Sequence, residues 1–117
     1  MYDTSEFTFV EHPGFTAELT ALTNDETYRI FQTELAERVE AWPIVRGTGG
    51  LRKSRKRLAG RGKRSSARVL YLWIPKHRVL FLYMTYTKGD IEDVPAAQLK
   101  TIRNEIQRIK KTFGEKG

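Results

Sequence analysis

Charge is distributed along this chain in blocks, and that layout limits what the chain can fold into and bind. Residues 46–88 hold thirteen lysines and arginines and no aspartate or glutamate, whereas residues 1–45 hold nine acidic and two basic side chains. Residues 89–117 are nearly balanced, so the net charge of +7 comes from the middle of the chain. Such a basic block creates a concentrated positive field, whose natural partners are polyanions: RNA, DNA, an anionic membrane or an acidic protein.

The composition favours one folded domain over residues 1–117. The length suits a single modest core, and 39% hydrophobic with 30% charged residues is typical of a folded soluble protein. There is no cysteine, which excludes disulfides and thiolate metal sites. No apolar run approaches the roughly 20 residues needed to cross a bilayer, and the acidic stretch Met1–Glu6 lacks the order of a secretory signal. We therefore expect a cytoplasmic protein.

The acidic first part of the chain predicts one strand and two helices. Phe7–Val10 has the character of a short strand, and Pro13 suits the first turn of a short helix after it. Asn24 offers a cap for a longer helix, which Pro43 is expected to stop. The apolar residues of that longer helix recur at helical spacing and so share one face; they are Tyr28, Phe31, Leu35, Val39 and Trp42.

The rest of the chain predicts strands followed by a helix. Residues 67–74 and 79–87 are rich in β-branched, aromatic and aliphatic side chains, and the short link between them makes them a hairpin. The basic run 51–58, after a turn at Gly47–Gly50, fits either a charged strand or a helical turn. A closing amphipathic helix carries Leu99, Ile102, Ile106, Ile109 and Phe113. The order predicts an α+β fold: a small, mostly antiparallel sheet with two N-terminal helices and one C-terminal helix.

Several short motifs together resemble a known protein family. They are Gly47–Lys53, Gly60–Tyr71, Thr85–Lys88 and Asp93–Ala96, followed by the closing helix. In this order they resemble the RelE/ParE superfamily, and within it the HigB-like toxins of bacterial toxin–antitoxin modules. The resemblance implies a small antiparallel sheet flanked by helices, and an endoribonuclease that cuts mRNA on the translating ribosome. It also implies a cognate antitoxin protein, usually with a helix-turn-helix DNA-binding part, that neutralises the toxin.

The resemblance leaves other activities open. ParE members share this fold but inhibit DNA gyrase, and a member without catalysis would be a nucleic-acid-binding module. The dense basic strand favours the nuclease, because a gyrase inhibitor has no need of a phosphate-binding pocket. Membrane binding is a weaker alternative, since the basic residues are expected on strand and loop and not on an amphipathic helix with a basic face.

RNA cleavage without a metal ion or cofactor defines what the site must do. The 2′-OH attacks the neighbouring phosphate while the 5′-oxygen leaves, so the enzyme must align the two, stabilise extra charge and move two protons. Arginine meets two phosphate oxygens at once with its planar fork, and lysine can donate a proton. The candidate catalytic residues are Lys53, Arg55, Arg68, Tyr86 and Lys88. The candidate contacts to the RNA backbone are Arg52, Lys56, Arg57, Arg61, Lys63 and Arg64.

Each candidate also has a purely structural interpretation. A basic strand is often only a solvated surface, Arg68 could form an ion pair with an acid from the first part of the chain, and Tyr86 has the pattern of a core residue. His77 is expected to be an exposed turn residue, and His12 is too isolated to be a metal ligand. Ser54 stands where the strand would carry an aliphatic residue, which predicts weaker packing.

Overall fold

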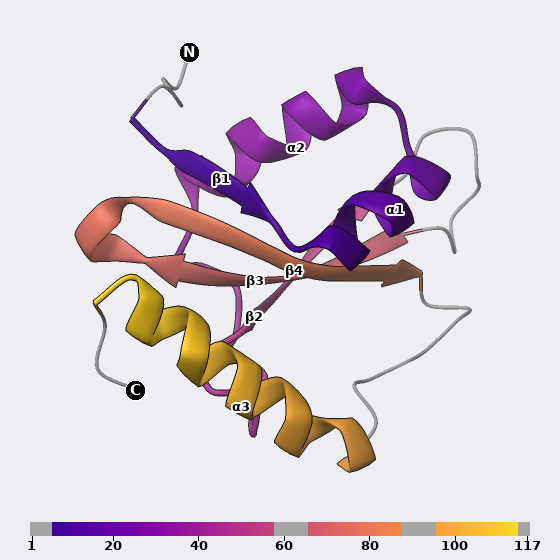
Figure 1. The fold of residues 1–117 in the computed structure, drawn as a ribbon. Helices are drawn as coiled ribbons and strands as arrows, with labels where there is room; N and C mark the ends of the chain where they lie inside the picture. The colour runs from indigo at the N-terminus through magenta and orange to yellow at the C-terminus, as the bar shows by residue number, and fades with distance from the viewer. Residues whose placement is uncertain (1–5, 58–65, 88–95, 115–117) are drawn as a thin grey trace.

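The order of elements confirms the predicted α+β fold. The computed structural model describes residues 6–57, 66–87 and 96–114 of the chain. The elements are β1 (Thr8–Glu11), α1 (Pro13–Leu22), α2 (Asp25–Glu37), β2 (Arg52–Arg57), β3 (Ser66–Ile74), β4 (Val79–Thr87) and α3 (Ala96–Thr112) (Figure 1). Within these ranges, no helix combines the length and the apolar character needed to span a membrane.

The four strands form one sheet in the order β1-β4-β3-β2. β3 is antiparallel to both β2 and β4, whereas β1 runs parallel to β4. The β3–β4 hairpin forms as predicted, through a short 3₁₀ turn at Pro75–His77 and a left-handed Arg78. The sheet is therefore mostly antiparallel, with β3 and β4 at its centre.

β2 is an edge strand made almost entirely of cations. On its outer side, Ile44 forms an isolated bridge to Arg52. On its inner side, the whole strand pairs with β3. Ser54, where the sequence favours an aliphatic residue, is buried, and its hydroxyl donates a hydrogen bond to the Val69 carbonyl (3.0 Å). This serine therefore adds a direct bond between the two strands.

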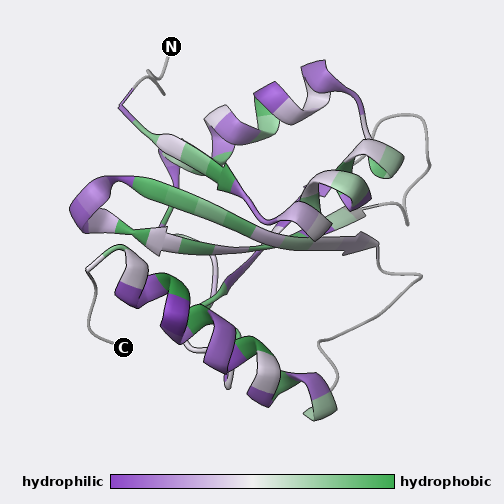
Figure 2. Ribbon diagram, in the orientation of Figure 1, coloured by the Kyte–Doolittle hydropathy of each residue, from purple (hydrophilic) through white to green (hydrophobic). Residues whose placement is uncertain are grey.

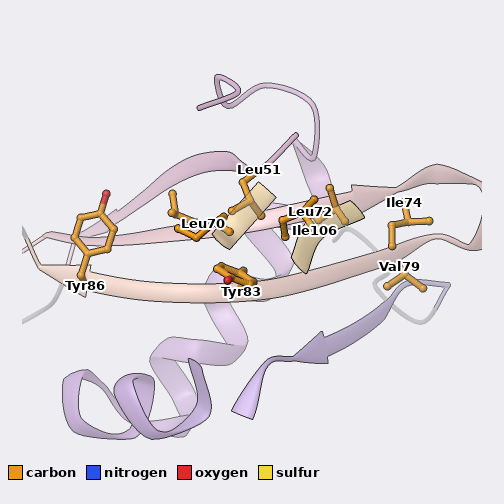
Figure 3. Packing of buried hydrophobic residues seen from close by; sticks show 9 residues of the cluster. Leu51, Leu70, Leu72, Ile74, Val79, Tyr83, Tyr86 and Ile106 are labelled. Atoms are coloured by element: carbon orange, nitrogen blue, oxygen red, sulfur yellow. The ribbon is translucent and has the colours of Figure 1, made fainter. Parts of the chain in front are cut away.

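Two hydrophobic cores lie on opposite faces of the sheet. α3 covers one face, and α1 and α2 cover the other (Figure 1). The α3-side core contains Leu51, Leu70, Leu72, Ile74, Val79, Tyr83, Tyr86, Ile102 and Ile106 (Figure 3). The α2-side core contains Phe15, Phe31, Leu35, Val69, Tyr71, Leu80 and Leu82. β3 and β4 carry apolar side chains on both faces, because both faces of the sheet are covered.

α3 is amphipathic as predicted. Its apolar side faces the sheet and its polar side faces outward (Figure 2), with Ile102 and Ile106 buried. The chain turns at Gly114 with a φ of 76°, which glycine adopts readily. His77 is exposed, and its Nε2 donates to the Phe113 carbonyl (2.8 Å), which ties the hairpin turn to the end of α3.

The end of α2 differs from the sequence prediction. The helix ends at Glu37 and not near Pro43. Arg38 leaves the helical conformation, with a φ of −139° and a ψ of 46°, and side chains from the sheet hold the segment after it by binding its backbone carbonyls. The Tyr71 hydroxyl, for example, donates to the Val39 carbonyl (2.6 Å). Val39 and Trp42 still pack on the same core as Tyr28, Phe31 and Leu35, although their predicted helical conformation is wrong.

The turn at Gly47–Gly50 packs beneath α3 and fixes the start of β2. Thr48 is fully buried; its Oγ1 donates to a backbone carbonyl three residues earlier (2.7 Å) and accepts from the Leu51 amide (3.0 Å). Gly49 has a φ of 86°, and a Cβ placed there would lie 3.4 Å from Ile106. The turn therefore needs both the threonine hydroxyl and the small residues beside it.

Thr48→Val tests the role of this hydroxyl, because valine keeps the shape and leaves the buried Leu51 amide without its partner. We expect the free energy of unfolding to fall by about 1–3 kcal/mol. Urea denaturation measures the change. Thr101→Val on the exposed side of α3 is the matched control, with an expected change below about 0.5 kcal/mol. Equal stability of the two variants would contradict this account of the turn.

Candidate nucleic-acid interface

The cations of β2 are divided between the two faces of the sheet. β2 pairs with β3 so that Lys53 lies opposite Leu70, and Arg55 lies opposite Arg68. Directly paired residues in an antiparallel sheet point to the same face, and Leu70 belongs to the α3-side core. Lys53, Arg55 and Arg68 therefore share the face that α3 covers in part.

A β-bulge in β4 brings a tyrosine to the same face. The pairing of β3 with β4 shifts by one residue between Leu70 and Tyr71, which leaves Tyr83 as an extra residue in β4. The shift reverses the alternation of β4 beyond the bulge and sets Tyr86 opposite Arg68. Tyr86 therefore belongs to the α3-side core, at one end of it beyond Leu70 (Figure 3).

We call Lys53, Arg55, Arg68 and Tyr86 the cationic face. Arg55 is exposed, Lys53 and Arg68 are half-buried, and Tyr86 is 4% exposed. Paired residues on neighbouring strands have Cβ atoms about 5 Å apart, so Arg55 and Arg68 can both reach one phosphate. Arg55, on the edge strand, also borders an open groove of about 440 Å³ between β2 and α2.

Arg52 and Lys56 point to the other face, where the first part of the chain engages them. The Arg52 guanidinium donates to the backbone carbonyls of Glu40 (3.1 Å) and Trp42 (2.7 Å). Lys56 forms an ion pair with Glu34 of α2, with 2.7 Å between Nζ and Oε1. Both cations therefore hold α2, or the segment after it, to the sheet. Their contact with RNA stays a prediction.

The remaining candidates are Arg57, Tyr86 and four residues outside the described parts of the chain. Arg57 is the last residue of β2, opposite Ser66. Tyr86 packs in the core, as its structural interpretation predicts, so its ring is covered and a base could not stack on it in this conformation. Four further candidates lie outside the described residues: Arg61, Lys63, Arg64 and Lys88.

A hydrogen-bonded cluster of titratable side chains joins α1, β4 and α3. Tyr83, the bulge residue, donates to Glu105 of α3, and His12 Nε2 lies 3.2 Å from the same carboxylate. His12 Nδ1 accepts from the Gly14 amide (3.2 Å), so the ring proton is assigned to Nε2, which donates to Glu105. Sequence reasoning missed this cluster, because no local pattern connects residues 93 positions apart.

These contacts change the titration of the cluster. The hydrogen bond from Tyr83 lowers the pKa of Glu105; partial burial opposes that effect, and the hydrogen bond from His12 adds to it. Burial, reinforced by the hydrogen bond to Glu105, raises the pKa of the Tyr83 hydroxyl. Across the described parts of the chain, no three His, Asp or Glu side chains gather into a group that could hold a metal ion. The hydrogen bonds of the cluster link the start of α1, β4 and α3 to one another.

Comparison with known protein families leaves this interface without a family assignment, because no family model matches the chain. The resemblance of Gly47–Lys53 and the neighbouring motifs to the RelE/ParE superfamily stays a prediction. The arrangement itself depends on the register of the sheet, which sets cations of β2 and β3 side by side on one face. Such an arrangement can hold a phosphate group.

The Glu105 contacts predict a pH-dependent contribution to stability. Because the folded-state pKa is lowered, the contribution is complete above the ordinary value of 4.5 and is lost as the pH falls through the lowered folded-state value. Glu105→Gln should lower the free energy of unfolding at neutral pH. The difference from wild type should shrink as the pH falls below 4.5. Urea denaturation over a series of pH values measures it.

Tyr83→Phe is the matched variant, because it removes the main donor to Glu105 and keeps the ring. It should reproduce most of the pH-dependent difference. A difference from wild type that is constant at every pH would show that the carboxylate is not the group responsible.

Proposed function

We propose that this chain is the toxin of a toxin–antitoxin module and acts as a ribosome-dependent mRNA endoribonuclease. The observation that carries the proposal is that Lys53, Arg55 and Arg68 lie on one face of two neighbouring strands. Cations gathered in this way suit a single phosphodiester, where charge builds up during cleavage. The resemblance of the sequence motifs to HigB-like toxins supports the same activity.

In the proposed reaction a ribose 2′-oxygen attacks the adjacent phosphorus, and the bond from phosphorus to the 5′-oxygen breaks. Arg55 and Arg68 hold the phosphoryl oxygens and stabilise the charge of the transition state. Lys53 donates a proton to the leaving 5′-oxygen. The ribosome supplies the base for the 2′-hydroxyl, which accounts for the dependence on it. Tyr86, opposite Arg68 on β4, is a positioning residue.

The proposal includes a cytoplasmic location and a protein partner. A cationic face that binds RNA must be shielded in resting cells, and a cognate antitoxin with a helix-turn-helix part would do this. The antitoxin would either cover the face directly or dock elsewhere and prevent entry to the ribosome by its bulk. Both modes are compatible with cations on one side of a small sheet.

Two lysines of β2 provide a matched test. Lys53→Ala and Lys56→Ala remove the same charge from the same strand, but on opposite faces. Lys53→Ala, and likewise Arg68→Ala, should lower mRNA cleavage by about a hundredfold or more and relieve growth arrest on induction. Lys56→Ala removes a partly exposed ion pair with Glu34 and a predicted contact to the RNA backbone, but no catalytic group, so cleavage should fall by about tenfold at most. Primer extension on mRNA after induction measures the cleavage.

The same induction experiment separates the alternatives. If Lys53→Ala and Arg68→Ala are folded by circular dichroism and cut mRNA like wild type, the proposed site is wrong. If the wild-type protein stops DNA replication while mRNA stays intact, a gyrase inhibitor replaces the nuclease. Intact mRNA together with normal replication would indicate a nucleic-acid-binding module without catalysis.

A further inference from the structure

The outer surface of α3 carries only positive charge. Five of its residues are basic, namely Lys100, Arg103, Arg108, Lys110 and Lys111. Its single acid, Glu105, is held by Tyr83 and His12 at the junction with β4 and α1. A solvated helix usually mixes both signs of charge, so an unbalanced surface of this kind indicates an anionic partner.

Part of this surface borders the turn that leads into β2. Arg103 Cγ lies 3.6 Å from where a Cβ on Gly49 would stand. Lys110 Nζ lies 3.2 Å from where a Cβ on Gly50 would stand. Arg46, just before the turn, is exposed. We call Arg46, Arg103 and Lys110 the turn-side flank. None of the three forms an ion pair with the described residues.

The turn-side flank borders the turn just before β2, and Lys53 of the cationic face follows Gly50 by three residues. Gly50 is followed by buried Leu51, and β2 then presents Lys53 on the face that α3 covers in part. Along α3, Arg103 and Lys110 are about 10 Å apart, at 1.5 Å per residue. A strand of nucleic acid that passes the cationic face can therefore continue along the helix.

We infer that the turn-side flank is a second contact for an RNA backbone, adjoining the cationic face; this inference rests on the proposed function. Its ligand is a run of phosphates, either the substrate mRNA or ribosomal RNA. A membrane surface fits poorly, because the apolar side of α3, with Ile102 and Ile106, is buried against the sheet and cannot enter lipid. The lysine and the arginines of the flank offer charge without base readout, so the contact is independent of sequence.

The test compares two arginines of the same helix. Arg103 and Arg108 are both exposed, and they point about 140° apart around the helix axis. Arg103→Gln with Lys110→Gln removes two charges of the flank, and Arg108→Gln is the control on the other side. Binding is measured with the full chain, first to a fluorescein-labelled single-stranded RNA and then to purified ribosomes without mRNA, over a range of salt concentrations.

We expect the double variant to bind about tenfold more weakly, and Arg108→Gln to stay within about twofold of wild type. The slope of log affinity against log salt should become shallower by about 1.4 for two lost contacts to single-stranded RNA. An effect on the labelled RNA identifies the substrate strand as the ligand, and an effect on ribosomes alone identifies ribosomal RNA; both support the inference.

Unchanged affinity of the double variant in both assays, or an equal loss in Arg108→Gln, would overturn the inference. That result would leave an acidic protein as the partner for this surface. The outcome is separate from that of the nuclease, because binding is measured without cleavage. If Lys53→Ala abolishes cutting while the flank variants bind normally, the proposed nuclease activity is supported and the second RNA contact is rejected.

Discussion

The register between β2 and β3 is the constraint on which the rest of this structure depends. Because side chains alternate along a strand, a shift of one residue would exchange the cations of the two faces. Three buried groups oppose such a shift: Thr48 fixes the turn before β2, Leu51 enters the α3-side core, and Ser54 bonds to a carbonyl of β3. A few buried side chains therefore keep an otherwise charged strand in its register.

The acidic and basic blocks of the sequence meet on one face of the sheet. The acidic first part of the chain forms α2 and the segment after it, and these engage Lys56 and Arg52 on one face. The other face meets α3, whose single carboxylate is already held by a tyrosine and a histidine. The acidic first part of the chain thus neutralises part of the basic block on one face of the sheet.

Local patterns predicted most of the fold, since periodicity and caps depend on residues close in sequence. They failed at the end of α2, because the segment after Glu37 is held by side chains from distant strands that no local pattern connects to it. For the site, the sequence named Lys53, Arg55 and Arg68 as candidates, but their meeting on one face depends on sheet register. Tyr86 joins them through a bulge that leaves no clear mark in the sequence, and the link from His12 to α3 is equally non-local.

The position of β2 at the edge of the sheet has a further consequence. An edge strand presents backbone donors and acceptors on which a strand of another molecule can assemble, and many proteins discourage this with charged edge residues. Here five of the six residues of β2 are lysine or arginine, so two such edges repel each other when molecules meet. The charge that makes this strand suitable for a polyanion therefore also protects the protein against aggregation through its sheet.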